Sequence, residues 1–252
     1  MLLLYRFFGY IDSNLLKNYR NRLTAAGLTI WNRDLGNTAI EVNEIPLLPS
    51  DVPFGVYFGM GLLPTAVFIA AIFTGSVLTG QDFEFETITE YRLTPYPYIL
   101  CLSARITRLM ITGLLGGIVL VTAIGITTGY WPGNIIMLLI SLIPIGITAA
   151  GLGILAGLVF KRTIPSFVIS LALSFTLWIL GSAFGLAQGF GGLYARLSLL
   201  TINTHTVYLL FKQYFGFNAV PVMDSTIILI IIAASTTLIT SAIYQKRLTS
   251  LE

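Results

Sequence analysis

The sequence predicts an all-α integral membrane protein with five transmembrane helices, and three observations predict it. Only 10% of the residues are charged, whereas soluble domains carry roughly 25%. Apolar residues make up 56% of the chain, and the mean hydropathy is +0.86. The apolar residues gather in runs of about 20, enough to cross ~30 Å of hydrocarbon as helices. Because the alternating pattern of barrel strands is absent, helices are the remaining way to satisfy the backbone in lipid.

The five predicted spans follow one another along the chain. They cover, approximately, residues 54–80, 109–130, 134–160, 165–188 and 225–244. None of them contains Asp, Glu, Lys, Arg or His, which argues against a proton-coupled carrier or a voltage sensor. The single cysteine, Cys101, excludes an internal disulfide, and with the single His205 it leaves no cluster for a metal site.

The basic residues are distributed unevenly between the two sides of these spans. Segment 81–108, the turn at 161–164 and the C-terminal tail carry seven, whereas the loops on the opposite side carry only Arg196 and Lys212. In a membrane protein this placement sets orientation, so the net charge of +3 does not indicate a nucleic-acid partner. The positive-inside rule therefore predicts a multi-pass protein of the plasma or inner membrane with its C-terminus in the cytoplasm.

With that orientation, residues 1–53 form an external N-terminal segment, and residues 54–252 form the transmembrane domain. The external segment nevertheless contains five basic residues, which would normally hold it inside. Either the orientation is reversed, or the chain lacks an earlier span that exported this segment. The segment is too short to bury a core of its own, and its end is a proline-rich linker into the membrane.

The long loop at 189–224 is apolar rather than polar. Its aromatic and aliphatic residues recur at helical spacing, so we expect short helices that dip into the outer membrane interface, where aromatic rings prefer to lie.

The charges of the chain are concentrated in segment 82–108, which holds four carboxylates and three arginines. The pattern predicts a cytoplasmic amphipathic helix over about 83–95, with Glu86 and Glu90 on one face and Phe85 and Ile88 on another. Thr94-Pro95 ends this helix, because proline disfavours a helical residue before it. Pro97 then suits the first turn of a helix that continues into the second span.

This segment resembles the coupling helix in the permease subunits of type-2 ABC transporters. Those subunits carry an acidic pattern, then Gly-Thr, and a few residues later Thr-Pro. The sequence differs from that pattern at Glu86, where glycine is usual before Thr87. The family's order of external segment, span, coupling helix and four further spans also fits residues 40–252, with only the first span missing. The resemblance therefore implies a permease that is shortened or split at its N-terminus.

The resemblance implies that a separate ABC ATPase subunit binds this helix. The residues that would contact the ATPase are Glu84, Phe85, Glu86, Thr87, Ile88, Glu90, Tyr91, Arg92, Thr94 and Pro95. The sequence contains no G-x-x-x-x-G-K-[ST] loop, so ATP and Mg²⁺ would bind to the partner, and this chain would need no cofactor. A second permease copy, identical or homologous, would complete the pathway among membrane lipids. We expect an uncharged cavity that contains Tyr57, Tyr130, Trp131 and Trp178, and such a cavity indicates an amphipathic or apolar cargo, such as a drug, a lipid or a lipid-linked glycan.

Two other functions remain open from the residues. An intramembrane hydrolase could use Ser182 as nucleophile and His205 as base, although GSAFG is not a G-x-S-x-G motif and no carboxylate is evident to orient the histidine. A non-catalytic membrane scaffold would have the same spans but no need of an acidic surface helix.

Overall fold

The computed structural model describes residues 54–93, 95–181, 192–215 and 222–249, together with Arg22, Ala26 and Gly27. These residues are almost entirely helical and include no strand, which confirms the predicted all-α class. The helices from residue 54 onward are α2 (Phe54–Glu84), α3 (Ile88–Leu93), α4 (Tyr98–Thr128), α5 (Ile135–Phe160), α6 (Thr163–Leu180), α7 (Gly192–Ser198), α8 (Ile202–Phe215) and α9 (Val222–Thr249).

Within the described residues, five helices are long and apolar enough to cross a membrane: α2, α4, α5, α6 and α9. This confirms the number of predicted spans and supports a multi-pass membrane protein. Helix α4 begins at Tyr98 and continues into the second predicted span, which confirms the helix start that the sequence predicts at Pro97. Pro97 has an extended backbone and starts the helix at Tyr98, and the arginines that follow do not interrupt it.

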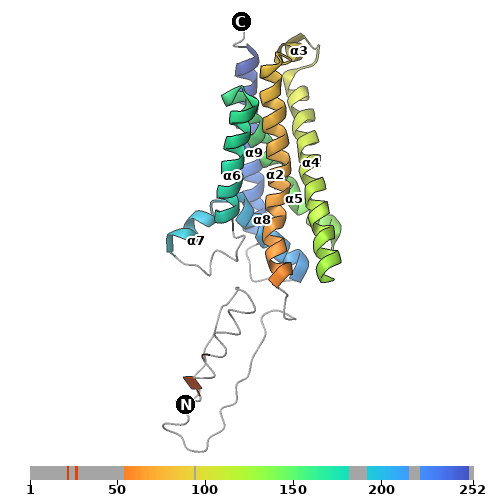
Figure 1. Ribbon diagram of the computed structural model, residues 1–252, viewed down its shortest axis with the longest axis vertical. Helices are drawn as coiled ribbons and strands as arrows, with labels where there is room; N and C mark the ends of the chain where they lie inside the picture. Colours follow the sequence, from red (N-terminus) through yellow and green to blue (C-terminus); the bar gives the residue numbers. More distant parts are fainter. Residues whose placement is uncertain are drawn as a thin grey trace, which may run out of the picture.

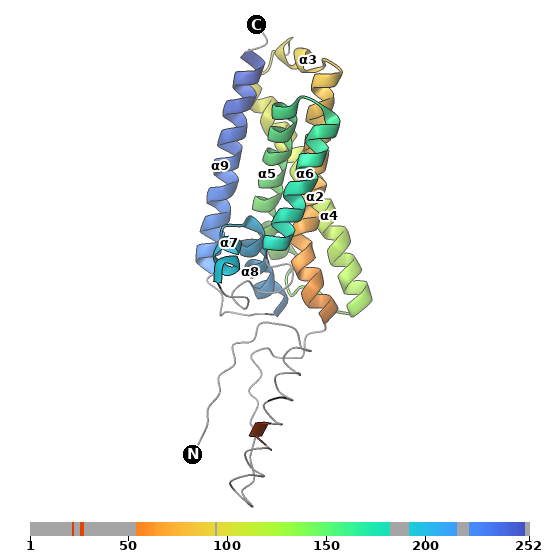
Figure 2. The ribbon, with the colours of Figure 1, turned by 60° about the vertical axis from the view of Figure 1, so that its left-hand side comes forward.

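The five long helices run side by side, with α5 in the middle of the bundle (Figures 1 and 2). Helix α5 contacts α2, α4, α6, α8 and α9. Its approach to α2 depends on Gly153 and Gly157, because a Cβ atom at Gly153 would lie 2.5 Å from the carbonyl oxygen of Ile72. Small residues let helix backbones approach closely in lipid, where no hydrophobic force drives helices together.

The charged segments that the sequence places on one side of the membrane lie at one end of this bundle. Helix α3, the α5–α6 turn and the C-terminal end of α9 are together there, and α7 and α8 lie at the opposite end (Figure 1). The described parts of segment 81–108, the turn at 161–164 and the end of α9 thus share one end of the bundle, as the predicted topology requires. Which side of which membrane this is stays a prediction.

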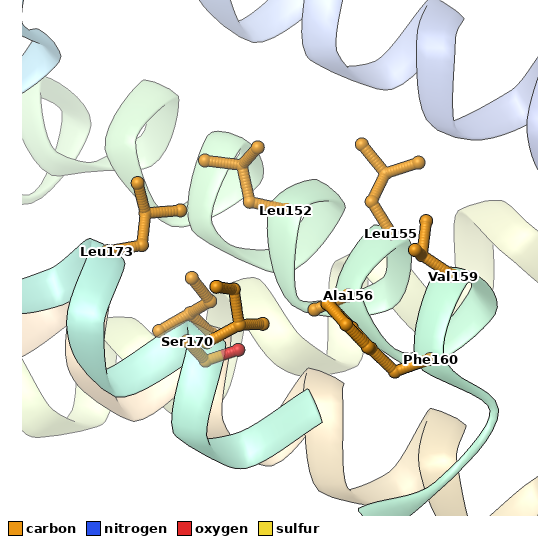
Figure 3. A pocket seen from close by; sticks show the side chains of 9 residues that line it. Leu152, Leu155, Ala156, Val159, Phe160, Ser170 and Leu173 are labelled. Carbon is orange, nitrogen blue, oxygen red and sulfur yellow. The ribbon is translucent and has the colours of Figure 1, made fainter. Parts of the chain in front are cut away.

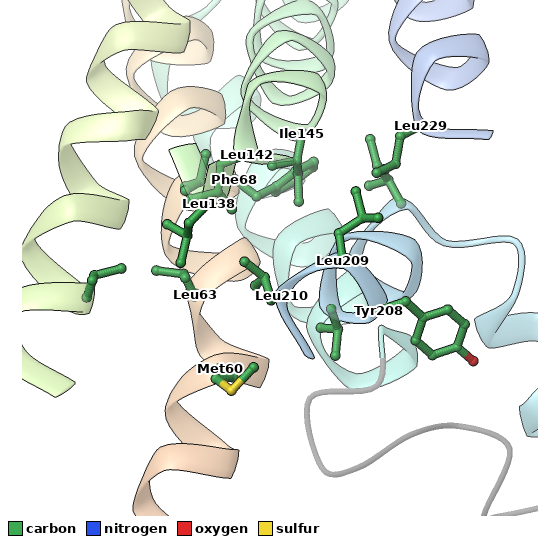
Figure 4. Packing of buried hydrophobic residues seen from close by; sticks show 14 of the residues in the cluster. Met60, Leu63, Phe68, Leu138, Leu142, Ile145, Tyr208, Leu209, Leu210 and Leu229 are labelled. Atoms are coloured by element: carbon green, nitrogen blue, oxygen red, sulfur yellow. The ribbon is translucent and has the colours of Figure 1, made fainter. Parts of the chain in front are cut away.

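The loop at 189–224 contains two short helices, α7 and α8, as expected. Helix α8 does not present a single apolar face, however, because every residue from Ile202 to Phe211 is buried. Its side chains join the main apolar core with residues of α2, α5 and α9 (Figure 4). The Asn203 amide nitrogen donates to the carbonyl of Leu177 at 3.2 Å, whereas its Oδ1 is buried and accepts no hydrogen bond from the described residues. Placement of these helices at a membrane interface stays a prediction.

Candidate docking surface at the α3 end

The predicted helix over 83–95 is broken in the structure. Helix α2 continues through Glu84, the chain turns at residues 85–87, and α3 covers only Ile88–Leu93. Glu86 has φ of +60°, in the left-handed region, and no helix continues through that conformation. The end at Leu93 agrees with the expected stop before Pro95; Thr94 lies outside the described residues, as does the Arg92 side chain.

The left-handed residue occupies the position at which the type-2 pattern has glycine. Glycine adopts positive φ at no steric cost, whereas other residues adopt it rarely. The Glu86 carbonyl accepts hydrogen bonds from the amide and the hydroxyl of Thr89, at 3.1 and 2.7 Å. The backbone therefore turns into α3 at residue 86, where the type-2 pattern has glycine and this sequence has glutamate.

The expected faces of the segment are wrong for the same reason. Ile88 is only 4% exposed, whereas Phe85 is 71% exposed. Glu90 lies in α3 and Glu86 in the preceding turn, and both are exposed. Glu86, the left-handed residue, lies between Phe85 and Ile88 and changes the chain direction, so spacing by 3.6 residues no longer decides which side chains share a face.

Asp82 and Arg105 form a partly buried ion pair beneath this turn. Their side chains are 15% and 12% exposed, and the pair joins the end of α2 to α4. The Thr87 hydroxyl donates to Asp82 Oδ1 at 3.3 Å, which ties the turn to the same carboxylate. Neither Asp82 nor Arg105 was among the expected contact residues. The signal for them was two opposite charges on either side of the elbow, but only the tertiary structure brings them together.

Two further contacts brace this end of the bundle. The Glu84 carboxylate accepts hydrogen bonds from the backbone amide of Thr163, at 3.0 Å, and from its hydroxyl, which links α2 to the start of α6. The Tyr98 hydroxyl donates to Gln245 Oε1 at 3.0 Å and links α4 to α9. Glu84, which the motif places in the ATPase contact, is therefore engaged within its own chain.

The braced segment presents a mixed apolar and acidic surface, which we call the α3 surface. Leu93 is 85% exposed, and Phe85, Tyr91 and Tyr96 are also exposed. All four lie between the first two candidate spans, so a membrane core would not cover them. Exposed apolar patches bordered by polar groups mark interaction sites. The α3 surface consists of Phe85, Glu86, Glu90, Tyr91, Leu93 and Tyr96.

The described residues do not include a site made of Ser182 and His205, the two residues of the hydrolase alternative. Ser182 lies outside the described residues. His205 is 4% exposed, and its Nδ1 lies 3.2 Å from the Ser225 hydroxyl while its Nε2 lies 2.8 Å from the carbonyl oxygen of Leu199. The second ring nitrogen thus meets a backbone carbonyl, where a hydrolytic triad would place a carboxylate. These contacts join α8 to α9 and to the corner before α8.

The aromatic residues expected to line a cargo cavity are dispersed. Tyr57 packs edge-on against Phe211 of α8, with ring centroids 5.3 Å apart, and Trp131 lies against Gly125. Of the two grooves that we describe below, Trp178 lines one, and Tyr57, Tyr130 and Trp131 line neither. The described part of the chain also gathers no three His, Cys, Asp or Glu side chains that could hold a metal ion.

The chain matches no protein-family model, and no curated protein is significantly similar to it.

Proposed function

We propose that this chain is the transmembrane subunit of an ATP-driven exporter of the type-2 ABC class, and that the α3 surface docks its ATPase. The observation that carries the proposal is the left-handed turn at Glu86, which coincides with the glycine of the coupling-helix pattern. The turn, which Asp82 and Arg105 brace, leads into a short helix that buries Ile88 and exposes apolar and acidic side chains.

The bracing gives the α3 surface a physical route to the spans. A partner that pushes on α3 acts on α2 and α4 through the Asp82–Arg105 pair, because this pair joins both helices to the turn. Rigid elements of this kind convert closure of one domain into movement of another. ATP hydrolysis would take place on the partner, and the cargo would be amphipathic or apolar. A second copy of the chain, or a homologous permease, would complete the pathway.

Charge reversal on the α3 surface tests the proposal. We expect Glu86→Lys with Glu90→Lys to remove the ATPase from the complex purified in mild detergent, and to abolish ATP-dependent transport. Losing one partner of a buried, hydrogen-bonded charge pair at an interface costs about 2–5 kcal/mol, and losing one at the rim costs much less. At the upper end this weakens binding more than a thousandfold. Both residues are exposed, so the variant should still insert and fold.

Asp224→Lys is the matched control, because Asp224 is an exposed acidic residue at the opposite end of the bundle. It should retain the ATPase. If the α3 surface instead rests on lipid headgroups, the added lysines will strengthen membrane contact and leave transport unchanged. Normal ATPase retention and transport by the charge-reversed protein would sink the proposal.

A further inference from the structure

A groove lies between α5 and α6 in the half of the bundle that ends at α3. It has a volume of about 170 Å³, and Figure 3 shows the side chains of both helices around it. Its lining is apolar except for one hydroxyl and includes Ile72, Leu152, Val159, Phe160, Ile169 and Leu173. Phe160 and Val159 are 43% and 54% exposed, so the groove opens on the surface that faces lipid in a membrane.

The groove has the length of one lipid leaflet. Its lining on α5 runs from Leu152 to Phe160. At about 1.5 Å per residue, this is roughly 12 Å along the helix. Half of a hydrocarbon core of ~30 Å is about 15 Å. A single acyl chain from the leaflet on the α3 side therefore matches the groove in length and in polarity.

The end of the groove is positively charged. Phe160 is the last residue of α5, and Lys161 and Arg162 follow it directly and are both exposed. Lys161 Nζ lies 5.7 Å from the centre of the Phe83 ring, at the end of α2. Arg162 also interacts electrostatically with the Glu84 carboxylate, which accepts a hydrogen bond from the amide of Thr163. Two cations thus face one carboxylate at the mouth, which leaves a positive charge where a lipid phosphate would lie.

We propose that this groove binds an anionic phospholipid, with one acyl chain between α5 and α6 and the headgroup phosphate at Lys161 and Arg162. A second groove, of about 200 Å³, lies in the other half of α6 and is lined by Leu62, Thr65, Ile69, Ser174, Phe175 and Trp178. None of these residues is adjacent to a basic residue in the sequence. It serves as an internal comparison. The proposal does not depend on the transport function.

Photocrosslinking in lipid nanodiscs tests the site. The full chain is reconstituted with phosphatidylglycerol or phosphatidylcholine that carries a diazirine in the acyl chain, and crosslinked peptides are mapped by mass spectrometry. We expect phosphatidylglycerol to crosslink preferentially to α5 and α6 around the first groove. Because a basic residue near the surface contributes about fivefold to anionic-lipid binding, Lys161→Gln with Arg162→Gln should reduce this crosslink roughly 25-fold. Arg196→Gln with Lys212→Gln, at the other end, should not.

Filling each groove separates the acyl-chain contact from the charge contact. Ala156 lines the first groove, so Ala156→Phe should remove its crosslinks with either lipid, whereas Leu62→Phe in the second groove should leave them unchanged. Circular dichroism and gel filtration check that each variant is folded. If a groove-filling variant does not fold, the Lys161→Gln and Arg162→Gln variant still tests the proposal, because both of its residues are exposed. Equal crosslinking by the two lipids, or crosslinking that survives both the charge change and the filled groove, would overturn the proposal.

Discussion

At the residue scale, a few polar side chains hold the α3 end of the bundle in shape. Asp82 accepts from Arg105 and from the Thr87 hydroxyl, so one carboxylate joins two helices and the turn between them. Glu86 sits in a strained backbone conformation two residues before α3 begins. Both features can be tested by stability measurements on the isolated chain, without any partner.

We expect Asp82→Asn to destabilise the purified chain by about 1–3 kcal/mol, because it leaves the partly buried guanidinium of Arg105 without its carboxylate. Thermal unfolding in detergent, followed by circular dichroism, measures the change. Glu90→Gln is the control, since Glu90 is exposed on α3 and such a change stays within about 0.5 kcal/mol. Equal melting temperatures for the two variants would show that the ion pair does not hold the turn.

The left-handed turn makes a different prediction for position 86. Glycine at this position removes backbone strain of about 1–2 kcal/mol but adds up to about 1 kcal/mol of unfolded-chain entropy, so Glu86→Gly should be neutral or slightly stabilising. A β-branched residue is disfavoured at positive φ, so Glu86→Val should cost about 1–3 kcal/mol. Glu90→Val, within α3, should cost less than about 1 kcal/mol. Equal effects of valine at 86 and at 90 would contradict a left-handed residue at 86.

At the element scale, close helix contact rather than amphipathic patterning organises the bundle. Helix α5 passes α2 at Gly153 and Gly157, where a side chain would meet Ile72 and Thr79. Helix α6 follows the same principle, because the buried residues it contributes are Ser166, Ser170 and Ser174, at every fourth position. Larger side chains of α6 point outward and border the two grooves.

Gly153→Ala should therefore be strongly destabilising, because the added methyl meets the Ile72 backbone and cannot displace it. Overpacking of this kind costs about 1–3 kcal/mol or more. Gly55→Ala is the matched control, because a Cβ atom at Gly55 would lie 3.8 Å from its nearest neighbour, Thr128. This variant should be neutral, or more stable by up to about 1 kcal/mol. Detergent melting curves measure both. A stable Gly153→Ala variant would contradict the described packing of α5 on α2.

At the scale of the whole molecule, the two ends of the bundle differ in charge. Among the described basic residues of the bundle, those at the α3 end are Arg92, Arg105, Arg108, Lys161, Arg162, Lys246 and Arg247, and those at the α7–α8 end are Arg196 and Lys212; Arg22, in the segment before the bundle, belongs to neither group. This asymmetry predicts that the α3 end faces the cytoplasm.

Cysteine accessibility tests this orientation in a Cys101→Ser background. Glu90 and Arg196 are exposed at opposite ends of the bundle. We expect Glu90→Cys to react with a membrane-impermeant maleimide only after the membrane is opened, and Arg196→Cys to react in intact cells. The reverse pattern would overturn the orientation, and labelling of both from outside would contradict the placement of the two ends on opposite sides of a membrane.

The sequence by itself determined the helical class, the number of long apolar helices and the grouping of the charged segments at one end. These follow from composition and run length, since a backbone in lipid has few alternatives to a helix. It also predicted the elbow at Pro97, because proline restricts the backbone locally. Only the tertiary structure decided the break at Glu86, the pairing of Asp82 with Arg105, and the burial of α8 on all its faces. Each of these depends on contacts between residues distant in sequence or on a backbone conformation that glutamate rarely adopts, and helical periodicity contains neither.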